Sequence, residues 1–205
     1  MRIGIMAEGR DDQRVIEYIL KGLGVENVVD IRPSLKTDKT DKNTPNNNTT
    51  IGTWQGVKNA CLSGEDYDRF FFLEDSDYMV VHLDTAEIEQ NEASFVRPDK
   101  SDLPAYATEL RTQVVALINS WLTNENIART LHAVSIEEIE AWVLTVLMKT
   151  DTTASTNPKQ KLQYELRSQK VDDIAQKFRK SKNLKDCRSR NGSLDAFCKA
   201  VEVLL

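Results

Sequence analysis

The sequence predicts an α/β fold, in which a mostly parallel central sheet is flanked by helices and followed by a basic helical region. The chain opens with an apolar segment, an amphipathic helical pattern and a second apolar segment, which is the β-α-β unit of a parallel sheet. Two further apolar segments, 79–83 and 131–134, are separated by helical patterns. A chain of 205 residues suits one such domain, expected over 1–150, with a basic helical extension over 151–205 packed on it.

The first three elements have signals at both ends. An apolar, β-branched strand is expected over 2–7, and the acids that follow it are typical of the first turn of a helix. The helix is expected to run to about Leu23, where Gly24 ends it, and a second strand is expected over 28–31. The apolar residues of the helix fall on one face: Val15, Ile16, Ile19, Leu20 and Leu23.

The middle of the chain alternates polar and apolar segments. Residues 33–52 are polar and are expected to form a loop, after which a helix begins near Thr53. The aromatic run at 69–73 is consistent with either a buried strand or the packed end of that helix. The segment 79–83 indicates a strand, and the polar residues 85–104 indicate a second loop.

The second half of the chain is expected to be mostly helical. An amphipathic helix is predicted over 106–122, followed by a short strand at 131–134. Ser135 is then expected to cap a helix over 136–148, with Glu138 completing a capping box. Weaker helical patterns follow a polar linker near 158–168, 171–180 and 193–204. The three tryptophans stand at apolar helical positions and are expected in the core: Trp54, Trp121 and Trp142.

Composition excludes several classes of protein. Hydrophobic residues at 40% and charged residues at 29% are ordinary for a soluble globular chain, and no apolar run approaches the ~18 residues of a membrane span. The first residues do not match a signal peptide, because Glu8 interrupts the apolar stretch. The three cysteines lack a Cys-x-x-Cys spacing, and two histidines argue against a histidine-rich metal site. We therefore expect a cytoplasmic protein with reduced thiols and no membrane partner.

Charge is spread unevenly along the chain. The net charge is −5, yet residues 158–192 hold eleven Lys or Arg and four acids, whereas residues 65–92 hold ten acids and one basic residue. A basic segment beside an acidic site is able to guide a polyanion to metal ions held by carboxylates. A solvated basic helix face is the alternative interpretation.

Acidic residues follow two of the predicted strands. Glu8 comes directly after the first strand, with Gly9 for a tight turn and Asp12 in the first turn of the helix. Asp84 comes directly after the strand at 79–83. The crevice of an open α/β sheet lies at the carboxyl ends of its strands, and Mg²⁺ takes oxygen ligands, so Glu8 and Asp84 suit a metal site. The alternatives are acids matched to a helix dipole and an ordinary acidic loop.

A third acid stands within an apolar helical pattern. Glu140 lies four residues after Ile136 and one turn before Leu144, on or beside the apolar face. A carboxylate in that position requires a partner, such as a metal ion or an arginine. A glutamate at the solvent edge of the helix is the alternative.

Together, three pieces of the chain resemble the OLD-like branch of the TOPRIM-fold proteins, which are small bacterial proteins. The pieces are strand-Glu8-Gly9-x-x-Asp12-helix, strand-Leu83-Asp84-Thr85 and Ile139-Glu140-Ala141-Trp142-Val143-Leu144. The resemblance implies that Glu8 is the motif-one glutamate, that Asp84 begins an Asp-x-Asp motif two, and that Glu140 is a later acid in a Glu-x-Trp context. It extends over nearly the whole chain, since the segment 193–197 resembles the Ser-x-x-x-Phe ending of these proteins.

The sequence departs from the family pattern at the second aspartate of motif two, where Ala86 stands. Three explanations are open. Glu87 or Glu89 replaces the missing ligand, or the protein is a degenerate, weakly catalytic member, or the chain carries an engineered Asp→Ala change. We favour the third slightly, because nothing else in the region looks decayed.

A different register of motif two is also open. Asp75 and Asp77 themselves form an Asp-x-Asp pattern after the aromatic run. We prefer Asp84, because the next helix and the Glu140 segment then follow at familiar distances.

The resemblance implies phosphodiester cleavage with Mg²⁺ or Mn²⁺, and Glu8, Asp84 and Glu140 as catalytic residues. The metal ligands would be Glu8, Asp12, Asp84 and Glu87. Members of the family often accompany an ABC-type ATPase in phage-defence or toxin-like systems, so an ATPase partner is implied, and homo-oligomerisation stays open. Nine basic residues would bind the phosphate backbone of DNA or RNA: Lys159, Lys161, Arg167, Lys177, Arg179, Lys180, Lys182, Arg188 and Arg190.

Two other functions remain open at this point. One is a non-catalytic partner or regulatory module on the same fold, for which Ala86 is the evidence. The other is an unrelated α/β enzyme that acts on small phosphoesters.

Overall fold

The centre of the protein is a sheet of four parallel strands. A computed structural model describes residues 1–33, 53–72 and 77–205. In this part of the chain the strand order is β2-β1-β3-β4. The α/β class with a parallel sheet flanked by helices is therefore confirmed. The strands are β1 (Ile3–Met6), β2 (Val28–Arg32), β3 (Tyr78–Asp84) and β4 (Thr130–Ser135).

The strand register brings the carboxyl ends of β1, β3 and β4 to one edge of the sheet. Ile3 of β1 pairs with Tyr78 of β3, and Asp84 at the end of β3 pairs with Ser135 at the end of β4. Because all of these strands run in the same direction, whatever follows each of them emerges at the same edge.

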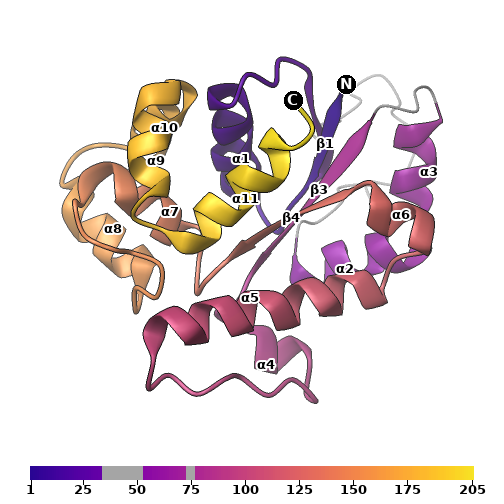
Figure 1. Ribbon diagram of the computed structural model, residues 1–205, viewed down its shortest axis with the longest axis horizontal. Helices are drawn as coiled ribbons and strands as arrows, with labels where there is room; N and C mark the ends of the chain where they lie inside the picture. The colour runs from indigo at the N-terminus through magenta and orange to yellow at the C-terminus, as the bar shows by residue number, and fades with distance from the viewer. Residues whose placement is uncertain (34–52, 73–76) are drawn as a thin grey trace, which may run out of the picture.

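Helices cover both faces of the sheet (Figure 1). One face packs on α1 (Arg10–Gly22), α7 (Glu140–Leu147) and the C-terminal helices, and the other on α2 (Trp54–Ser63), α3 (Glu65–Phe71) and α5 (Leu103–Ser120). Strand residues alternate between the two cores, as the pleat of a sheet requires. On β3, Val80 lies in the first core, and Met79 and Val81 lie in the second.

The C-terminal region packs against α1 and α7. Phe178 and Phe197 are fully buried in the same core as Ile16 and Trp142, and the rings of Trp142 and Phe197 stack with centroids 5.8 Å apart. The region consists of α8 (Pro158–Leu166), α9 (Val171–Ala175), the 3₁₀ helix η1 (Gln176–Arg179), α10 (Ser181–Arg188) and α11 (Gly192–Glu202). The sequence patterns did not predict α10 as a separate helix.

Two further short helices lie beside the second core, α4 (Ile88–Asn91) and α6 (Asn124–Ala128). The ambiguous aromatic run is the packed end of a helix rather than a strand, since α3 extends to Phe71 and Phe72 is 85% exposed. All three tryptophans are buried, as expected. None of the described helices combines the length and apolar character that a membrane span requires.

The expected helix start at Ser135 is wrong. Ser135 is the last residue of β4, and its hydroxyl bonds Asp84 rather than capping a helix. Glu137 adopts a left-handed conformation with φ 63°, which interrupts any helix over these residues, so α7 begins only at Glu140. Glu138 accepts a hydrogen bond from the backbone nitrogen of Lys159 at 3.0 Å instead of completing a capping box.

The close approach of η1 to α1 gives a stability prediction. A Cβ on Gly22 would lie 2.0 Å from the carbonyl oxygen of Phe178, so Gly22→Ala must push η1 away from α1. We expect this change to lower the free energy of unfolding by about 1–3 kcal/mol, measured by chemical denaturation. Gly192→Ala is the matched control, because a Cβ there meets Thr153 at an ordinary 3.7 Å. Equal stability of the two variants would contradict this packing.

Candidate acidic site at the carboxyl edge of the sheet

Four acids meet where β1 and β3 end. Glu8 follows β1, Asp84 ends β3, Asp12 lies in the first turn of α1, and Glu140 begins α7. Glu8 Oε1 accepts a hydrogen bond from the backbone nitrogen of Asp84 at 2.8 Å, which ties the ends of the two strands together. The sequence-based expectation that Glu8 and Asp84 lie close together is therefore met.

A buried histidine lies beneath these acids. His82 is fully buried, and its Nε2 lies 3.1 Å from the Ser135 hydroxyl and 3.3 Å from Asp84 Oδ1. Its Nδ1 lies 4.0 Å from Asp12 Oδ2 and has no hydrogen-bond partner among the described residues. Burial alone lowers the pKa of His82, but the hydrogen bond to Asp84 and the charges of Asp84, Asp12 and Glu8 raise it to about 9. His82 therefore holds a positive charge under the acids at neutral pH.

Burial and mutual repulsion raise the pKa values of three of the acids. Burial, followed by the charge of Asp84, raises the pKa of Glu8 to about 7. Burial also raises the pKa of Glu140 to about 7, with a further contribution from the charge of Asp84. The pKa of Asp12 is raised by burial and by Asp84, against the opposing charge of His82. A cation placed among these carboxylates would remove this repulsion.

Of the nine basic residues, Lys159 comes nearest to the acids. Its Nζ lies 4.0 Å from Glu140 Oε1, because α8 begins beside the start of α7. Lys161, two residues further along, is exposed and donates to the Ser155 hydroxyl at 3.0 Å. Arg167 is exposed just beyond the end of α8.

Four of the basic residues lie at the other end of α1. The helix begins beside the acids, and Phe178 of η1 packs on Gly22 at its far end. Roughly 15 Å along the helix axis separates Asp12 from Gly22. The four residues on η1 and the start of α10 are exposed there: Lys177, Arg179, Lys180 and Lys182. The structure thus separates four of the nine expected phosphate-binding residues from the acids.

The last two basic candidates, Arg188 and Arg190, form hydrogen bonds and ion pairs within the chain. Arg188 donates to Asp195 at 2.6 Å and to Glu202 at 2.9 Å. Arg190 donates to the backbone carbonyl oxygen of Met148 at 2.9 Å and pairs with Asp186. Both guanidinium groups are therefore less available to an external phosphate than the exposed lysines.

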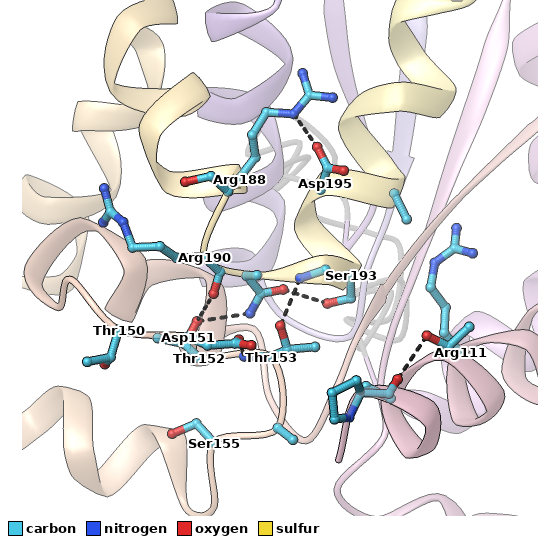
Figure 2. Close-up of a pocket in the computed structure, with 18 of the residues that line it drawn as sticks. Arg111, Thr150, Asp151, Thr152, Thr153, Ser155, Arg188, Arg190, Ser193 and Asp195 are labelled. Atoms are coloured by element: carbon cyan, nitrogen blue, oxygen red, sulfur yellow. Dashed lines mark hydrogen bonds and ion pairs between the residues drawn. The ribbon is translucent and has the colours of Figure 1, made fainter. Parts of the chain in front are cut away.

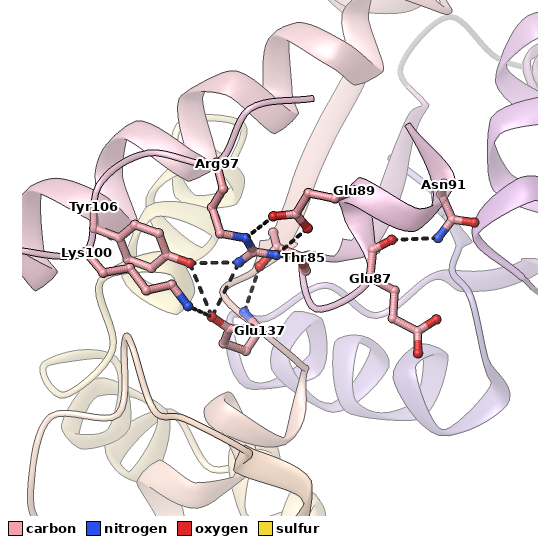
Figure 3. A network of polar contacts seen from close by, with 8 residues as sticks. All are labelled: Thr85, Glu87, Glu89, Asn91, Arg97, Lys100, Tyr106 and Glu137. Carbon is pink, nitrogen blue, oxygen red and sulfur yellow. Dashed lines mark hydrogen bonds and ion pairs between the residues drawn. The ribbon is translucent and has the colours of Figure 1, made fainter. Parts of the chain in front are cut away.

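The loop that contains Ala86 is fixed by Glu137. The backbone nitrogens of Thr85 and Ala86 each donate to the Glu137 carbonyl at 2.9 Å, and the Thr85 hydroxyl accepts from the Glu137 nitrogen at 2.7 Å. Arg97 joins this loop to the next helix, because it bonds the Thr85 carbonyl and pairs with Glu89 (Figure 3). Tyr106 and Lys100 complete this network through the Glu137 carboxylate.

The network bears on the two acids considered as replacements for the missing aspartate. Glu89 is occupied by Arg97, whose hydrogen bond lowers the pKa of Glu89. Glu87 is exposed, and Figure 3 shows its carboxylate directed away from the network. Neither makes a contact with Asp84 among the contacts found in the described residues.

The alternative register of motif two does not place two aspartates beside Glu8. Asp75 lies outside the described residues. Asp77 is fully buried before the start of β3 and accepts hydrogen bonds from the backbone and side-chain nitrogens of Arg2 at 3.0 and 2.9 Å. This is the amino edge of the sheet, opposite Glu8.

Sequence reasoning missed His82 and Ser135 as parts of this site. The signal for His82 was present, because it stands two residues before Asp84 on a strand and therefore shares its face. Ser135 carried no such signal, since its role depends on the pairing of β4 with β3.

The donor set suits a hard cation. Its oxygens are carboxylates, the ligands that Mg²⁺ and Mn²⁺ prefer, and burial, followed by the charge of Asp84, raises the pKa values of Glu8 and Glu140. Among the residues that the structure describes, no three of these side chains already lie in a metal-binding arrangement.

The raised pKa of Glu8 predicts how stability changes with pH. The folded state holds this proton more tightly than the unfolded state, whose pKa is near 4.5, so Glu8 lowers stability progressively as pH rises from about 4.5 to about 7. Glu8→Gln keeps an oxygen acceptor for the Asp84 nitrogen but has no charge. We expect it to match the wild type near pH 5 and to exceed its free energy of unfolding by about 2 kcal/mol at pH 8.

Denaturant titrations at both pH values check this expectation. His82 is present in both proteins, so the difference between them reports the loss of the Glu8 charge together with its effect on His82. Glu87→Gln is the control, since that side chain is exposed. A Glu8→Gln variant that is less stable than wild type at pH 8 would contradict the description of Glu8 as a buried, repelled carboxylate.

Three comparisons with known proteins found no similar protein. A scan of protein-family models matched none to this chain, and searches of curated proteins and of solved structures found no match. The interpretation of the acidic site therefore depends on its own residues.

Proposed function

We propose that the protein is a divalent-metal-dependent phosphodiester hydrolase, acting on nucleic acid and resembling the TOPRIM nucleases. The observation that carries this proposal is the meeting of Glu8, Asp12, Asp84 and Glu140 at the carboxyl edge of a parallel sheet, with raised pKa values for three of them. Such a concentration of partly buried carboxylates is unfavourable in the absence of a cation and is typical of metal sites for phosphate chemistry.

Glu8, Asp12 and Asp84 are the residues that would hold Mg²⁺ or Mn²⁺. When bound there, the metal would lower the pKa of an attacking water and stabilise charge on the phosphoryl oxygens. His82 and Ser135 orient the Asp84 carboxylate from below, as outer partners of a metal ligand do. Glu87 is the weakest of the expected ligands, because it is exposed.

Glu140 is suited to proton transfer. Its pKa of about 7 lets it take a proton from water and release it again near neutral pH. Lys159, 4.0 Å from Glu140, is positioned to contact a phosphate that enters beside it. A strand of nucleic acid long enough to pass along α1 would also meet the exposed cations on η1 and α10.

The biological setting rests on the family resemblance alone. By that resemblance the protein is the effector of a phage-defence or toxin-like system, controlled by an ABC-type ATPase. On the same resemblance, we propose that the protein also associates with copies of itself.

Ala86 favours a second candidate function. A protein that lacks one aspartate of motif two would act as a non-catalytic partner or regulatory subunit of an ATPase complex. Glu137 holds the backbone of Thr85 and Ala86 through hydrogen bonds, so the loop is fixed without a carboxylate at position 86.

A cleavage assay distinguishes the two functions. Plasmid DNA and total RNA are incubated with Mg²⁺ or Mn²⁺ and the wild-type chain, Ala86→Asp, or Ala86→Asp combined with Glu8→Ala. We expect Ala86→Asp to cut, and Glu8→Ala to reduce that activity by roughly two orders of magnitude or more, a loss typical of removing a group that stabilises charge in the transition state.

Two controls make the assay specific. Glu87→Ala in the Ala86→Asp background should retain activity, because Glu87 is exposed. EDTA should abolish cutting. If the wild-type chain itself cuts, the site works without the second aspartate. If no variant cuts with either metal, the catalytic proposal is overturned in favour of a binding module.

A further inference from the structure

A large cavity, lined by both polar and apolar side chains, lies apart from the acidic site. It has a volume of about 1330 Å³ and is bounded by α5, by the segment that follows α7, and by α10 and the start of α11 (Figure 2). Glu8, Asp12, Asp84 and Glu140 are not among its lining residues. Pockets for small ligands measure about 300–1,000 Å³, so this cavity has room for a molecule well above the size of an inorganic ion.

The cavity carries an excess of positive charge once its internal ion pairs are considered. Arg188 and Arg190 line it but are neutralised by acids of the same region. Three other cations line it: Arg111, Lys161 and Lys185. In the described part of the chain none of these three forms an ion pair, and Asp151 is the one lining acid outside the Arg188 cluster.

Arg111 is the most buried of the three cations. It is half-buried on α5, and its Nε is buried without a hydrogen-bond partner in the described structure. Burial with no carboxylate nearby lowers the pKa of Arg111. A planar guanidinium in this state is suited to paired hydrogen bonds with phosphate oxygens. Figure 2 shows it across the cavity from the segment that holds Thr150 to Ser155.

That opposite segment supplies hydroxyl donors. Thr153 Oγ1 accepts from the backbone nitrogen of Gly192 at 2.8 Å, and Ser155 Oγ accepts from Lys161 Nζ at 3.0 Å. Each hydroxyl still has its own proton to donate, and no acceptor for either proton is found among the described residues. Cations and hydroxyl donors around one cavity are what the oxygens of a phosphate group require.

We propose that this cavity binds a phosphate-bearing small molecule of about nucleotide size, with Arg111 and Lys185 on the phosphate and the hydroxyls of Thr153 and Ser155 as further donors. The proposal is independent of the hydrolase function, because it uses none of the acids of that site. It assigns the C-terminal region a ligand-binding role on a face that the acidic site does not use.

Isothermal titration calorimetry in EDTA tests the proposal without engaging the acidic site. The probes are inorganic phosphate, AMP, ATP and adenosine. We expect AMP and ATP to bind, and adenosine to bind at least about tenfold more weakly than AMP. Arg111→Gln should lower the affinity for ATP by about tenfold or more, because a hydrogen bond to a charged group is lost. Inorganic phosphate separates binding of the phosphate alone from binding of a nucleotide.

Matched variants keep the test decisive. Arg69→Gln removes an exposed arginine from α3, far from the cavity lining, and should leave ATP binding unchanged. Arg111→Lys retains the charge and should bind ATP more tightly than Arg111→Gln, and Lys185→Gln is a second loss variant if Arg111→Gln fails to fold. The proposal is overturned if no phosphate-bearing probe binds, or if adenosine binds as tightly as AMP.

Discussion

The parallel register of β1, β3 and β4 is the constraint on which the acidic site depends. Asp84 pairs with Ser135, so β3 and β4 end together, whereas Met6 at the end of β1 pairs with Val81, three residues before the end of β3. Glu8, two residues beyond β1, then reaches the backbone nitrogen of Asp84. A shift of one residue in either pairing would turn Asp84 and His82 to the opposite face of the sheet, into an apolar core.

Grouping acids at this edge requires a compensating charge inside the protein. His82 provides it, because it is buried directly under Asp84 and within reach of Asp12, and its pKa of about 9 keeps it cationic. The same hydrogen bonds take Ser135 away from the helix start that its sequence suggests. The site and the local backbone at 135–140 are therefore parts of one arrangement, in which Glu137 adopts a left-handed conformation and also fixes Thr85.

The C-terminal region combines structural and polar roles. Phe178 and Phe197 complete the core on the α1 face of the sheet, while Lys159 lies beside Glu140. Arg188 and Arg190, which belong to the basic stretch of the sequence, stabilise the packing of α10 through ion pairs with nearby acids. A high local density of basic residues is thus divided among internal ion pairs, a cavity wall and an exposed surface, and only part of it faces the acidic site.

The sequence by itself determined the α/β class, the four strands and the meeting of Glu8 with Asp84, because hydrophobic periodicity and strand-end acids are local patterns that a parallel sheet brings together. It also identified the three buried tryptophans. Tertiary structure alone decided the partners of Ser135 and the place of His82, because both depend on which strands are neighbours. It also decided that Arg188 is neutralised, since Arg188 meets Asp195 and Glu202 only after α10 and α11 have packed, whereas Arg190 pairs with Asp186 four residues away. Local sequence does not encode pairings across long separations, and the charge balance of a site is set by such pairings.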